Sequence, residues 1–561
     1  MENARSPAAP AHFRHWPPGL PRTLEFPRTS VYYNLEVTAR RHPDKPAVIF
    51  YDSALPYARL REEADALAGY LTRRCGVRRG DRVLLFMQNS PQFIVGFYAI
   101  LRADAMVVPV NPMNLTEELQ HYVHDSDATV ALCGQELYAQ LRPLLGAGLK
   151  HAVVAAYSDY VTAPTPLNLP DAVRAPRQAI ADEGAVLWAD ALAAALQPGP
   201  HAAGPDDLCV MPYTSGTTGR PKGCIHTHAT VMSTIVIMAQ WGGGHADSVI
   251  LGTLPLFHVT GMQGSMNVPI HLGATSVLMT RWDRDTAAQL IERYHVDGWT
   301  NISTMAIDFL ANPNLGRYDL TSLKRIGGGG AAMPEAVARR LKDLTGLDYI
   351  EGYGLSETIA PTHINPDNNP KKQCLGIPVC NTEALVIDPD TLDVLPLGEV
   401  GEIVSSGPQI FKGYWKSPQA TAECFIEIGG KRFFRTGDLG RIDEDGYFFI
   451  VDRLKRMINA SGYKVWPAEV EAIMYGHPDV QEACVIGSVD AHRGETVKAL
   501  VVLKAGSRGK VSPEEIIGWC RTHMAAYKIP RVVEFVDSLP KSATGKVQWR
   551  MLQEREATAR G

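Results

Sequence analysis

The sequence predicts an α/β protein, with a large N-terminal domain of parallel-rich sheets packed by helices and a small α+β domain at the C-terminus. Three observations lead to this fold class. The chain has 561 residues, whereas one hydrophobic core stops growing at roughly 250–300 residues. Strand and helix patterns alternate in the first half, and the C-terminal part has a pattern of its own.

The alternation is clearest over residues 82–110, which are typical of one β-α-β unit. The apolar run 82–88 predicts a strand, Ser90 and Pro91 begin a helix, and 106–110 is a second apolar run. Units of this kind build parallel sheets with helices on both faces. The apolar face of the expected helix consists of Phe93, Ile94, Phe97, Ile100 and Leu101.

The Ala- and Pro-rich stretch 158–205 breaks this alternation. It is expected to be a surface excursion with one short helix over 188–196 and no clear strand.

The C-terminal part predicts a separate small domain. Ser512 and Glu515 have the spacing of a capping box, and apolar runs at 498–504 and 531–536 flank the helix that they begin. The boundary is expected near Asp452, which divides the chain into domains 1–451 and 452–561.

Composition excludes several classes of protein. With 45% hydrophobic and 20% charged residues, a net charge of -5 and a pI near 6.4, the chain is typical of an ordinary globular protein and no nucleic-acid partner is expected. The first residues contain prolines and arginines where a signal peptide would be apolar, and no run of about 20 apolar residues predicts a membrane span. The nine cysteines form no C-x-x-C pair, so we expect reduced thiols and a cytoplasmic location.

The loop YTSGTTGRPKG, residues 213–223, is the strongest chemical signal. Small hydroxyl residues and glycines before a helix expose many N–H and O–H donors, which can surround phosphate oxygens. Pro221 and Gly223 depart from the P-loop pattern. A flexible Ser-, Thr- and Gly-rich linker is the alternative interpretation.

This loop resembles the AMP-binding signature of the adenylate-forming superfamily, which contains acyl-CoA synthetases, peptide-synthetase adenylation domains and beetle luciferases. Other stretches resemble further motifs of the family, in the family's order. They are PLFH (255–258), EGYGLSET (351–358), RTGD (435–438), the hinge-like stretch 451–471 and PKSATGK (540–546). The resemblance favours the acyl-CoA synthetase or fatty-acid–CoA ligase branch.

The resemblance implies an ATP site built from these motifs. Asp438 would accept from both ribose hydroxyls, Tyr353 would lie flat on adenine, and Lys222 would steady the departing phosphates. Taken alone, Asp438 would be an ordinary turn residue and Tyr353 a core residue. The other ATP contacts implied are Thr214, Ser215, Gly216, Thr217, Thr218, Gly219, Gly329, Ala331, Glu351, Gly352, Gly354, Thr358 and Arg453.

The implied reaction has two steps. A carboxylate attacks the α-phosphate of ATP to give acyl-AMP and pyrophosphate, and the thiol of coenzyme A then displaces AMP. Because two anions meet in the first step, cations are needed there. The resemblance assigns this task to the adenylation lysine Lys546 and to Mg²⁺, for which Glu357 and Thr214 are the expected ligands.

The resemblance also implies that the small domain is mobile and swings between the two steps. Asp452 stands at the hinge position. Coenzyme A, the co-substrate, would be bound by Ser461, Gly462 and Tyr463 along the pantetheine and by Lys528 at its phosphates.

The carboxylic acid is less closely specified. Amino-acid-activating relatives carry an aspartate where this chain has His258, so an amino acid is disfavoured; His258 would instead gate the acyl site, or be a core histidine. Glycines 327–330 leave room for a chain to pass. A medium- or long-chain fatty acid is the first choice and an aromatic acid the second. The apolar residues that would wall a tunnel, or equally form a core helix, are Trp299, Ile302, Met305, Ile307 and Phe309.

Other interpretations remain beside this one. His226 and His228 near Cys224 allow a metal site, although packing at a helix start is favoured. A luciferase-like oxygenase and an inactive nucleotide-binding protein are the other functions considered, the latter opposed by the joint presence of Glu357, Asp438, Arg453 and Lys546. Peripheral membrane contact and a homodimer stay open.

Overall fold

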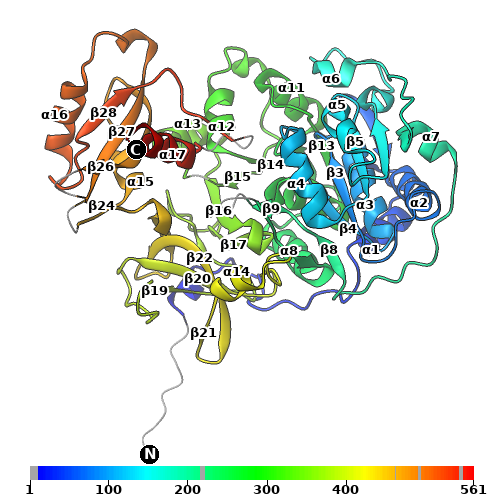
Figure 1. The fold of residues 1–561 in the computed structure, drawn as a ribbon, viewed down its shortest axis with the longest axis horizontal. Helices are drawn as coiled ribbons and strands as arrows, with labels where there is room; N and C mark the ends of the chain where they lie inside the picture. The colour runs from blue at the N-terminus through cyan, green and yellow to red at the C-terminus, as the bar shows by residue number, and fades with distance from the viewer. Residues whose placement is uncertain are drawn as a thin grey trace, which may run out of the picture. The chain divides into compact units, whose positions relative to one another are not determined.

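The computed structural model describes residues 10–214, 221–330, 332–460, 463–490, 494–542 and 547–560. Its internal contacts define two compact units. The first unit comprises residues 1–383 and 405–434, and the second comprises residues 384–404 and 435–561. Figure 1 follows the chain through the elements of both units. The expected hinge at Asp452 is not tested by this division and stays a prediction.

The first large sheet of the first unit has parallel strands at its centre and antiparallel strands at both edges. Two of its strands contain residues singled out in the sequence, the glycine tract that begins at Gly327 and the start of the EGYGLSET stretch at Glu351. In spatial order the strands are β18 (Ile377–Pro378), β17 (Ala360–Ile364), β16 (Tyr349–Leu355), β15 (Arg325–Gly329), β14 (Gly298–Asn301), β12 (Val249–Gly252), β13 (Thr275–Leu278), β1 (Pro46–Phe50) and β2 (Ser53–Pro56).

The second large sheet of this unit is parallel except at one edge, where β11 is antiparallel to β8. A separate hairpin of β9 (Tyr213–Thr214) and β10 (Lys222–Gly223) begins and ends the signature loop. In spatial order the sheet contains β11 (His226–Thr227), β8 (Leu208–Val210), β4 (Met106–Pro109), β3 (Arg82–Phe86), β5 (Val130–Gly134), β6 (His151–Ala155) and β7 (Ala185–Leu187).

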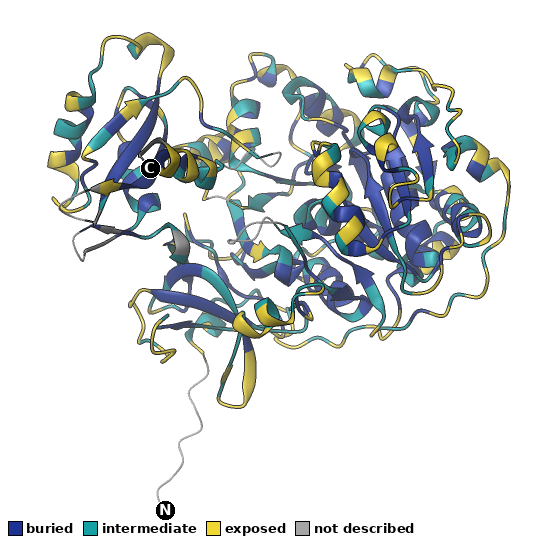
Figure 2. Cartoon of the chain, viewed as in Figure 1, coloured by how far each residue is buried: buried dark blue, intermediate teal, exposed yellow. Residues whose placement is uncertain are grey.

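Helices pack against these sheets, and the strands between them are buried (Figure 2). The expected β-α-β unit is confirmed as β3, α3 (Pro91–Arg102) and β4, with the Ser90 hydroxyl accepting from the Phe93 amide. All residues from 91 to 101 are buried, so α3 has no solvent face. The other helices of this unit are α1 (Tyr32–Arg41), α2 (Tyr57–Arg73), α4 (Thr116–Ser126), α5 (Tyr138–Leu141), α6 (Asp171–Arg174), α7 (Trp188–Ala193), α8 (His228–Trp241), α9 (Val259–Gly261), α10 (Val268–Leu272), α11 (Arg284–Tyr294), α12 (Ser303–Leu310), α13 (Glu335–Thr345) and α14 (Pro418–Glu423).

One expectation for the stretch 158–205 is wrong, because it contains strand β7. This strand has only three residues, and it forms because its backbone pairs in parallel with β6. A run so short leaves no recognisable periodicity in the sequence. The expected helix over 188–196 is present as the shorter α7.

A fourth sheet has the order β19-β20-β22-β21, with β23 also paired with β22. The division between the two units falls inside β20 and β22. The strands are β19 (Glu383–Ile387), β20 (Gly401–Ser406), β21 (Phe425–Ile428), β22 (Lys431–Ile442) and β23 (Phe448–Arg453).

The C-terminal part of the second unit is an α+β arrangement with its own apolar core. The capping box is confirmed, since the Ser512 hydroxyl accepts from the Glu515 amide at the start of α16 (Pro513–His523). The sheet has the order β25-β24-β27-β26, with β28 parallel to β27. Its elements are β24 (Ile458–Ala460), β25 (Tyr463–Val465), α15 (Pro467–Met474), β26 (Val480–Asp490), β27 (Gly494–Leu503), β28 (Val532–Phe535) and α17 (Trp549–Arg560).

Within the residues that the structure describes, none of the helices has both the length and the apolar character needed to cross a bilayer.

Candidate active site

The β9-β10 hairpin fixes the two ends of the signature loop. Thr214 and Lys222 are directly opposite each other in this antiparallel pair, so the expected metal ligand and the expected phosphate contact lie side by side. The residues between them, Ser215, Gly216, Thr217, Thr218 and Gly219 among the expected ATP contacts, lie outside the described residues.

Glu357 follows strand β16 in a short turn and is buried, with 8% of its surface exposed. The turn is rigid because the Thr358 hydroxyl accepts from the Leu355 amide at 2.9 Å and donates to the Ala360 carbonyl at 2.7 Å. The Tyr414 hydroxyl donates to Glu357 Oε1 at 2.8 Å. A buried, oriented carboxylate is a hard oxygen ligand of the kind that Mg²⁺ takes.

Tyr414 also meets the signature loop. The Lys222 ammonium lies 5.4 Å from the centroid of its ring, within the range of a cation–π contact. The structure therefore brings Glu357 and Lys222, which are 135 positions apart (357 minus 222), to one tyrosine side chain.

The other residues of the EGYGLSET stretch lie in β16. Both Glu351 carboxylate oxygens accept backbone amides, Oε1 from Met333 at 2.8 Å and Oε2 from Cys374 at 3.3 Å. Burial raises the pKa of this carboxyl. Glu351 thus ties β16 to two other segments, and its expected contact with ATP stays a prediction.

Tyr353 is nearly buried, and its ring lies 5.7 Å from that of His363. The adjacent Gly354 is required by the strand pairing, because a Cβ there would lie 2.4 Å from the Ala360 carbonyl oxygen. At Gly352 a Cβ would meet the His363 carbonyl oxygen at 3.4 Å, an ordinary contact. The expected adenine contact of Tyr353 stays a prediction.

The glycines of β15 are explained by close strand spacing. A Cβ at Gly329 would lie 2.3 Å from the Gly352 carbonyl oxygen, and one at Gly328 would lie 1.8 Å from the Asn301 carbonyl oxygen. The tract therefore keeps three adjacent strands together, which the sequence interpretation as room for an acyl chain did not anticipate. Ala331 lies outside the described residues.

Asp438 and Arg453 meet in the second unit. They are paired across β22 and β23, and Arg453 Nε lies 2.9 Å from Asp438 Oδ1. The preceding turn is held by Glu402, whose Oε1 accepts from the Gly437 amide at 3.0 Å and whose Oε2 binds Arg435 at 2.6 Å. The two residues that the resemblance assigns to the nucleotide are thus brought together across two adjacent strands.

Asp452 is buried at the end of β23, and its Oδ2 accepts from the Ala468 amide of α15 at 2.7 Å. Burial raises the pKa of Asp452. Lys528 forms an ion pair with Glu469 at the start of the same helix. The hinge and coenzyme A assignments stay predictions. Of the other expected residues of this unit, Ser461, Gly462, Lys546 and the side chain of Tyr463 lie outside the described part.

Comparison with known proteins bears on these motifs directly. A family model for the AMP-binding enzymes matches residues 35–415, and a model for the C-terminal domain of these enzymes matches residues 469–546. The chain belongs to the AMP-binding enzyme family. The resemblance read from the sequence motifs is confirmed.

Individual relatives of this AMP-binding enzyme match it over nearly its whole length. It is 34% identical over 555 residues to a long-chain-fatty-acid–CoA ligase of Bacillus subtilis (strain 168), covering 96% of this chain and 97% of the relative. It is 35% identical over 513 residues to a feruloyl-CoA synthase of Amycolatopsis sp, covering 91% and 95%. The crystal structure of ATP-bound MatB from Rhodopseudomonas palustris has a TM-score of 0.83 at 27% identity, covering 94% and 99%.

His258 of this AMP-binding enzyme is the last residue of PLFH and directly precedes α9 as its N-cap residue. Asn89 holds the PLFH turn from the start of α3: its Nδ2 donates to the Leu254 carbonyl at 2.9 Å, and its Oδ1 accepts from the Leu256 amide at 2.8 Å. Asn89 is buried. No sequence signal pointed to Asn89, since an asparagine before a helix cap is common.

Tyr414 is the second residue that sequence reasoning missed. It lies in a stretch of aromatic and small residues, FKGYW, where a tyrosine suggests packing. Only the fold places it against Glu357 and Lys222.

His226 and His228 are buried at the start of α8, as expected from packing. His226 Nε2 donates to the Ser356 carbonyl at 2.8 Å, and burial lowers the pKa of His226 to about 4. His228 Nδ1 accepts from the Val31 amide at 3.1 Å. In the described part of the chain, no group of three His, Cys, Asp or Glu side chains could hold a metal ion.

The apolar stretch after β14 divides between core and surface. Trp299 and Phe309 are in the main core with ring centroids 4.9 Å apart, whereas Ile307 is 46% exposed. These two aromatic residues therefore fit the core alternative.

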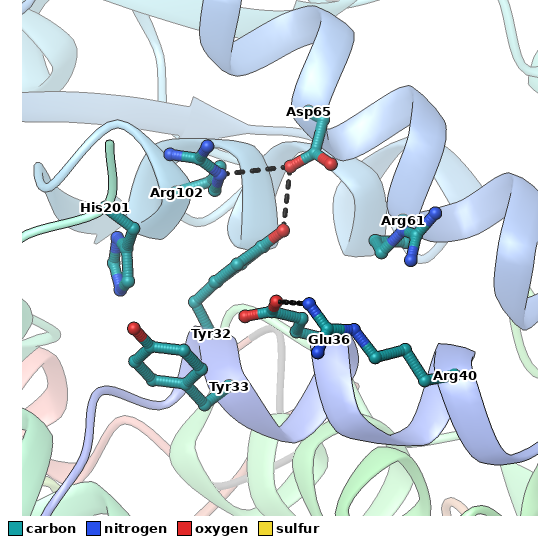
Figure 3. Close-up of a pocket in the computed structure, with 8 residues that line it drawn as sticks. All are labelled: Tyr32, Tyr33, Glu36, Arg40, Arg61, Asp65, Arg102 and His201. Atoms are coloured by element: carbon teal, nitrogen blue, oxygen red, sulfur yellow. Dashed lines mark hydrogen bonds and ion pairs between the residues drawn. The ribbon is translucent and has the colours of Figure 1, made fainter. Parts of the chain in front are cut away.

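A polar cavity of about 330 Å³ lies among α1, α2, the end of α3 and His201 (Figure 3). Its two carboxylates are already bonded: Asp65 Oδ1 accepts from the Tyr32 hydroxyl at 2.7 Å and from Arg102 at 3.1 Å, and Glu36 pairs with Arg40. These bonds join three helices, and none of the motif residues lines the cavity.

Proposed function

We propose that this AMP-binding enzyme joins a carboxylic acid to coenzyme A at the expense of ATP. A carboxylate oxygen of the acid attacks the α-phosphorus and forms an O–P bond as the bond from the α-phosphorus to pyrophosphate breaks. The thiol sulfur of coenzyme A then bonds to the acyl carbon, the thiol proton is released to solvent, and AMP leaves with the electron pair of the broken C–O bond. The observation that carries the proposal is that Glu357 and Lys222 both contact one side chain, that of Tyr414, beside the end of the signature loop.

The residues of this site fit a magnesium ion. Glu357 is buried and oriented, and Thr214 is placed opposite Lys222. When bound, Mg²⁺ supplies positive charge among the phosphate oxygens. Lys222 binds the departing pyrophosphate in this proposal, and Lys546 faces the charge that develops at the α-phosphate.

The second unit contributes the ribose contact and the second step. Asp438 binds the ribose hydroxyls while Arg453 holds its carboxylate. The small domain then turns about Asp452, so that residues 461–463 and Lys528 meet coenzyme A. This alternation rests on the resemblance to the family.

The acid is a medium- or long-chain fatty acid, with an aromatic acid as the alternative. The fatty acid is supported by the Bacillus subtilis relative, which is named a long-chain-fatty-acid–CoA ligase. The aromatic acid is supported by the relative named a feruloyl-CoA synthase. His258 has no carboxylate to hold an ammonium group, which opposes an amino acid.

The proposal includes a cytoplasmic location. All nine cysteines are free, and eight of them are buried, as expected for a protein of a reducing compartment. A homodimer and peripheral contact with a membrane are further parts of the proposal that an ultracentrifuge and a vesicle flotation assay would test.

A panel of carboxylic acids tests the proposed function. We expect fatty acids to release pyrophosphate and AMP from ATP, with thioester formed only when coenzyme A is present. Preference for cinnamic or benzoic acids would favour the alternative. ADP and phosphate as first products would contradict the mechanism, and nucleotide binding without turnover on any acid would indicate an inactive protein.

A further inference from the structure

The segment 411–415, which we call the tie segment, joins two motif stretches through its backbone. The Phe411 amide donates to the Glu357 carbonyl at 2.8 Å. The backbone of the tie segment also exchanges hydrogen bonds of 2.8, 2.9 and 3.0 Å with residues 223–225, which include the last residue of the signature loop. Because all three stretches belong to the first unit, the tie segment holds the Glu357 turn next to the end of the loop.

The backbone around Tyr414 has little freedom. Gly413 has φ of +145°, and a Cβ there would lie 2.5 Å from Thr421 Cγ2. The Thr421 hydroxyl accepts from the Tyr414 amide at 2.9 Å. This contact sets the direction in which the tyrosine side chain leaves the chain.

The hydroxyl and the ring of Tyr414 contact different residues. Its hydroxyl donates to Glu357 Oε1 at 2.8 Å, and its ring face lies 5.4 Å from the Lys222 ammonium. A phenol hydroxyl is protonated at neutral pH, and a carboxylate oxygen can only accept, so Tyr414 is the donor in this bond.

We propose that Tyr414 is a positioning residue for adenylation, which orients the carboxylate of Glu357 through its hydroxyl and holds the ammonium of Lys222 over its ring. This inference rests on the proposed function, which makes Glu357 a metal ligand and Lys222 a phosphate contact. A hydrogen bond to one carboxylate oxygen restricts rotation of the carboxylate and so prepares it for a metal ion. Outer partners of metal ligands typically contribute about 10–100-fold to metal affinity or activity.

The Tyr414→Phe variant separates the hydroxyl from the ring. Binding of Mn²⁺ to the enzyme with a non-hydrolysable ATP analogue is measured by electron paramagnetic resonance, and the Mg²⁺ dependence of pyrophosphate release is measured in parallel. We expect the dissociation constant of Mn²⁺ and the half-saturating Mg²⁺ concentration to rise about tenfold. At saturating Mg²⁺ the turnover should recover most of its wild-type value.

The matched control is Tyr32→Phe, which removes the same kind of bond, a tyrosine hydroxyl to a carboxylate, at a cavity that none of the motif residues lines. Tyr32 is 2% exposed, and its hydroxyl donates to Asp65 at 2.7 Å (Figure 3). We expect this variant to lose thermal stability while its Mn²⁺ affinity stays unchanged. Equal loss of metal affinity in both variants, or none in Tyr414→Phe, would overturn the positioning role.

Tyr414→Leu tests the ring. Loss of the contact with Lys222 should raise the KM for ATP about two- to fivefold beyond that of Tyr414→Phe. Equal KM values in the two variants would refute this half of the inference. Thermal melting of both variants shows whether they are folded.

Glu357→Gln distinguishes this inference from the proposed function. If Glu357→Gln weakens Mn²⁺ binding and Tyr414→Phe does not, the proposed function stands and the inference fails. If Glu357→Gln leaves Mn²⁺ binding intact, the metal assignment itself is wrong. In the double variant we expect the two effects to be less than additive, because both substitutions act on one carboxylate.

Discussion

Several residues for which the motifs suggest a chemical role make structural contacts in this enzyme. Glu351 accepts two backbone amides, and Gly329 lies against the Gly352 carbonyl. Glu357 differs, because the Tyr414 hydroxyl orients its carboxylate in the turn after β16. In the proposed function, Glu357 is accordingly placed for chemistry, whereas Glu351 and Gly329 hold the sheet together.

Gly329→Ala should destabilise the enzyme. The new Cβ would lie 2.3 Å from a backbone oxygen of the neighbouring strand, so β15 or β16 must shift, and overpacking of this kind costs about 1–3 kcal/mol. Urea unfolding measures the loss. Gly316→Ala is the control, since nothing lies within 4 Å of its added Cβ, and it should be nearly neutral.

If glycines 327–330 left room for an acyl chain, the larger Gly329→Leu substitution would shorten the preferred acid. The close strand contact predicts instead a loss of folded protein. A folded Gly329→Leu enzyme with a shortened chain-length profile would support the tunnel and contradict the packing explanation.

At the scale of elements, the enzyme connects distant segments through hydrogen bonds of one buried side chain, that of Asn89, and of the backbone of the tie segment. The start of α3 holds the PLFH turn through Asn89, and the tie segment holds the Glu357 turn. Each connection joins two segments that are distant in the sequence. Their polar atoms are buried, so breaking either connection leaves unpaired groups.

Asn89→Ala should loosen the turn before His258. It leaves the Leu254 carbonyl and the Leu256 amide without their partner, and each buried unpaired group costs about 1–3 kcal/mol. We expect the KM for the acid to rise by a larger factor than the KM for ATP, both measured by pyrophosphate release. The melting temperature should fall.

Asn89→Asp provides the comparison, because it keeps the acceptor for Leu256 but places a carboxylate oxygen against the Leu254 carbonyl oxygen. Its loss of stability should be at least as large as that of Asn89→Ala, because a buried charge and this repulsion add to the lost bond. A rise in both KM values by the same factor would indicate general unfolding in place of a displaced turn.

At the scale of the whole molecule, the proposed reaction uses the second unit for two different tasks. Asp438 and Arg453 are joined on one hairpin of this unit, and Asp452, at the proposed hinge, directly precedes Arg453. The family resemblance assigns different residues of this unit to adenylation and to thioester formation. This assignment leads to a kinetic prediction for each half-reaction.

Lys546→Ala should abolish formation of acyl-AMP and spare the second half-reaction. Loss of one preorganised donor at developing charge typically costs about 10²–10³ in rate. Supplied acyl-AMP and coenzyme A should still give thioester. Gly462→Leu should do the reverse, because a bulky side chain would narrow the pantetheine path.

Circular dichroism and thermal melting check that both variants fold. Equal damage to both half-reactions in folded variants would argue against two alternating domain orientations.

The sequence by itself determined most of the helices and strands that we expected, and the motif residues of this enzyme. Ser90 and Ser512 predicted helix starts, because a helix cap depends only on residues adjacent in the chain. The family motifs pointed to Glu357, Asp438 and Lys222, because such motifs are recognised from the type and order of residues alone. Local patterns missed β7, whose three residues form a strand only beside β6. The tertiary structure alone decided that Tyr414 meets Glu357, 57 positions away in the chain, and that Asn89 holds the PLFH turn. Contacts of this kind depend on how sheets bring remote segments together, and no local periodicity encodes them.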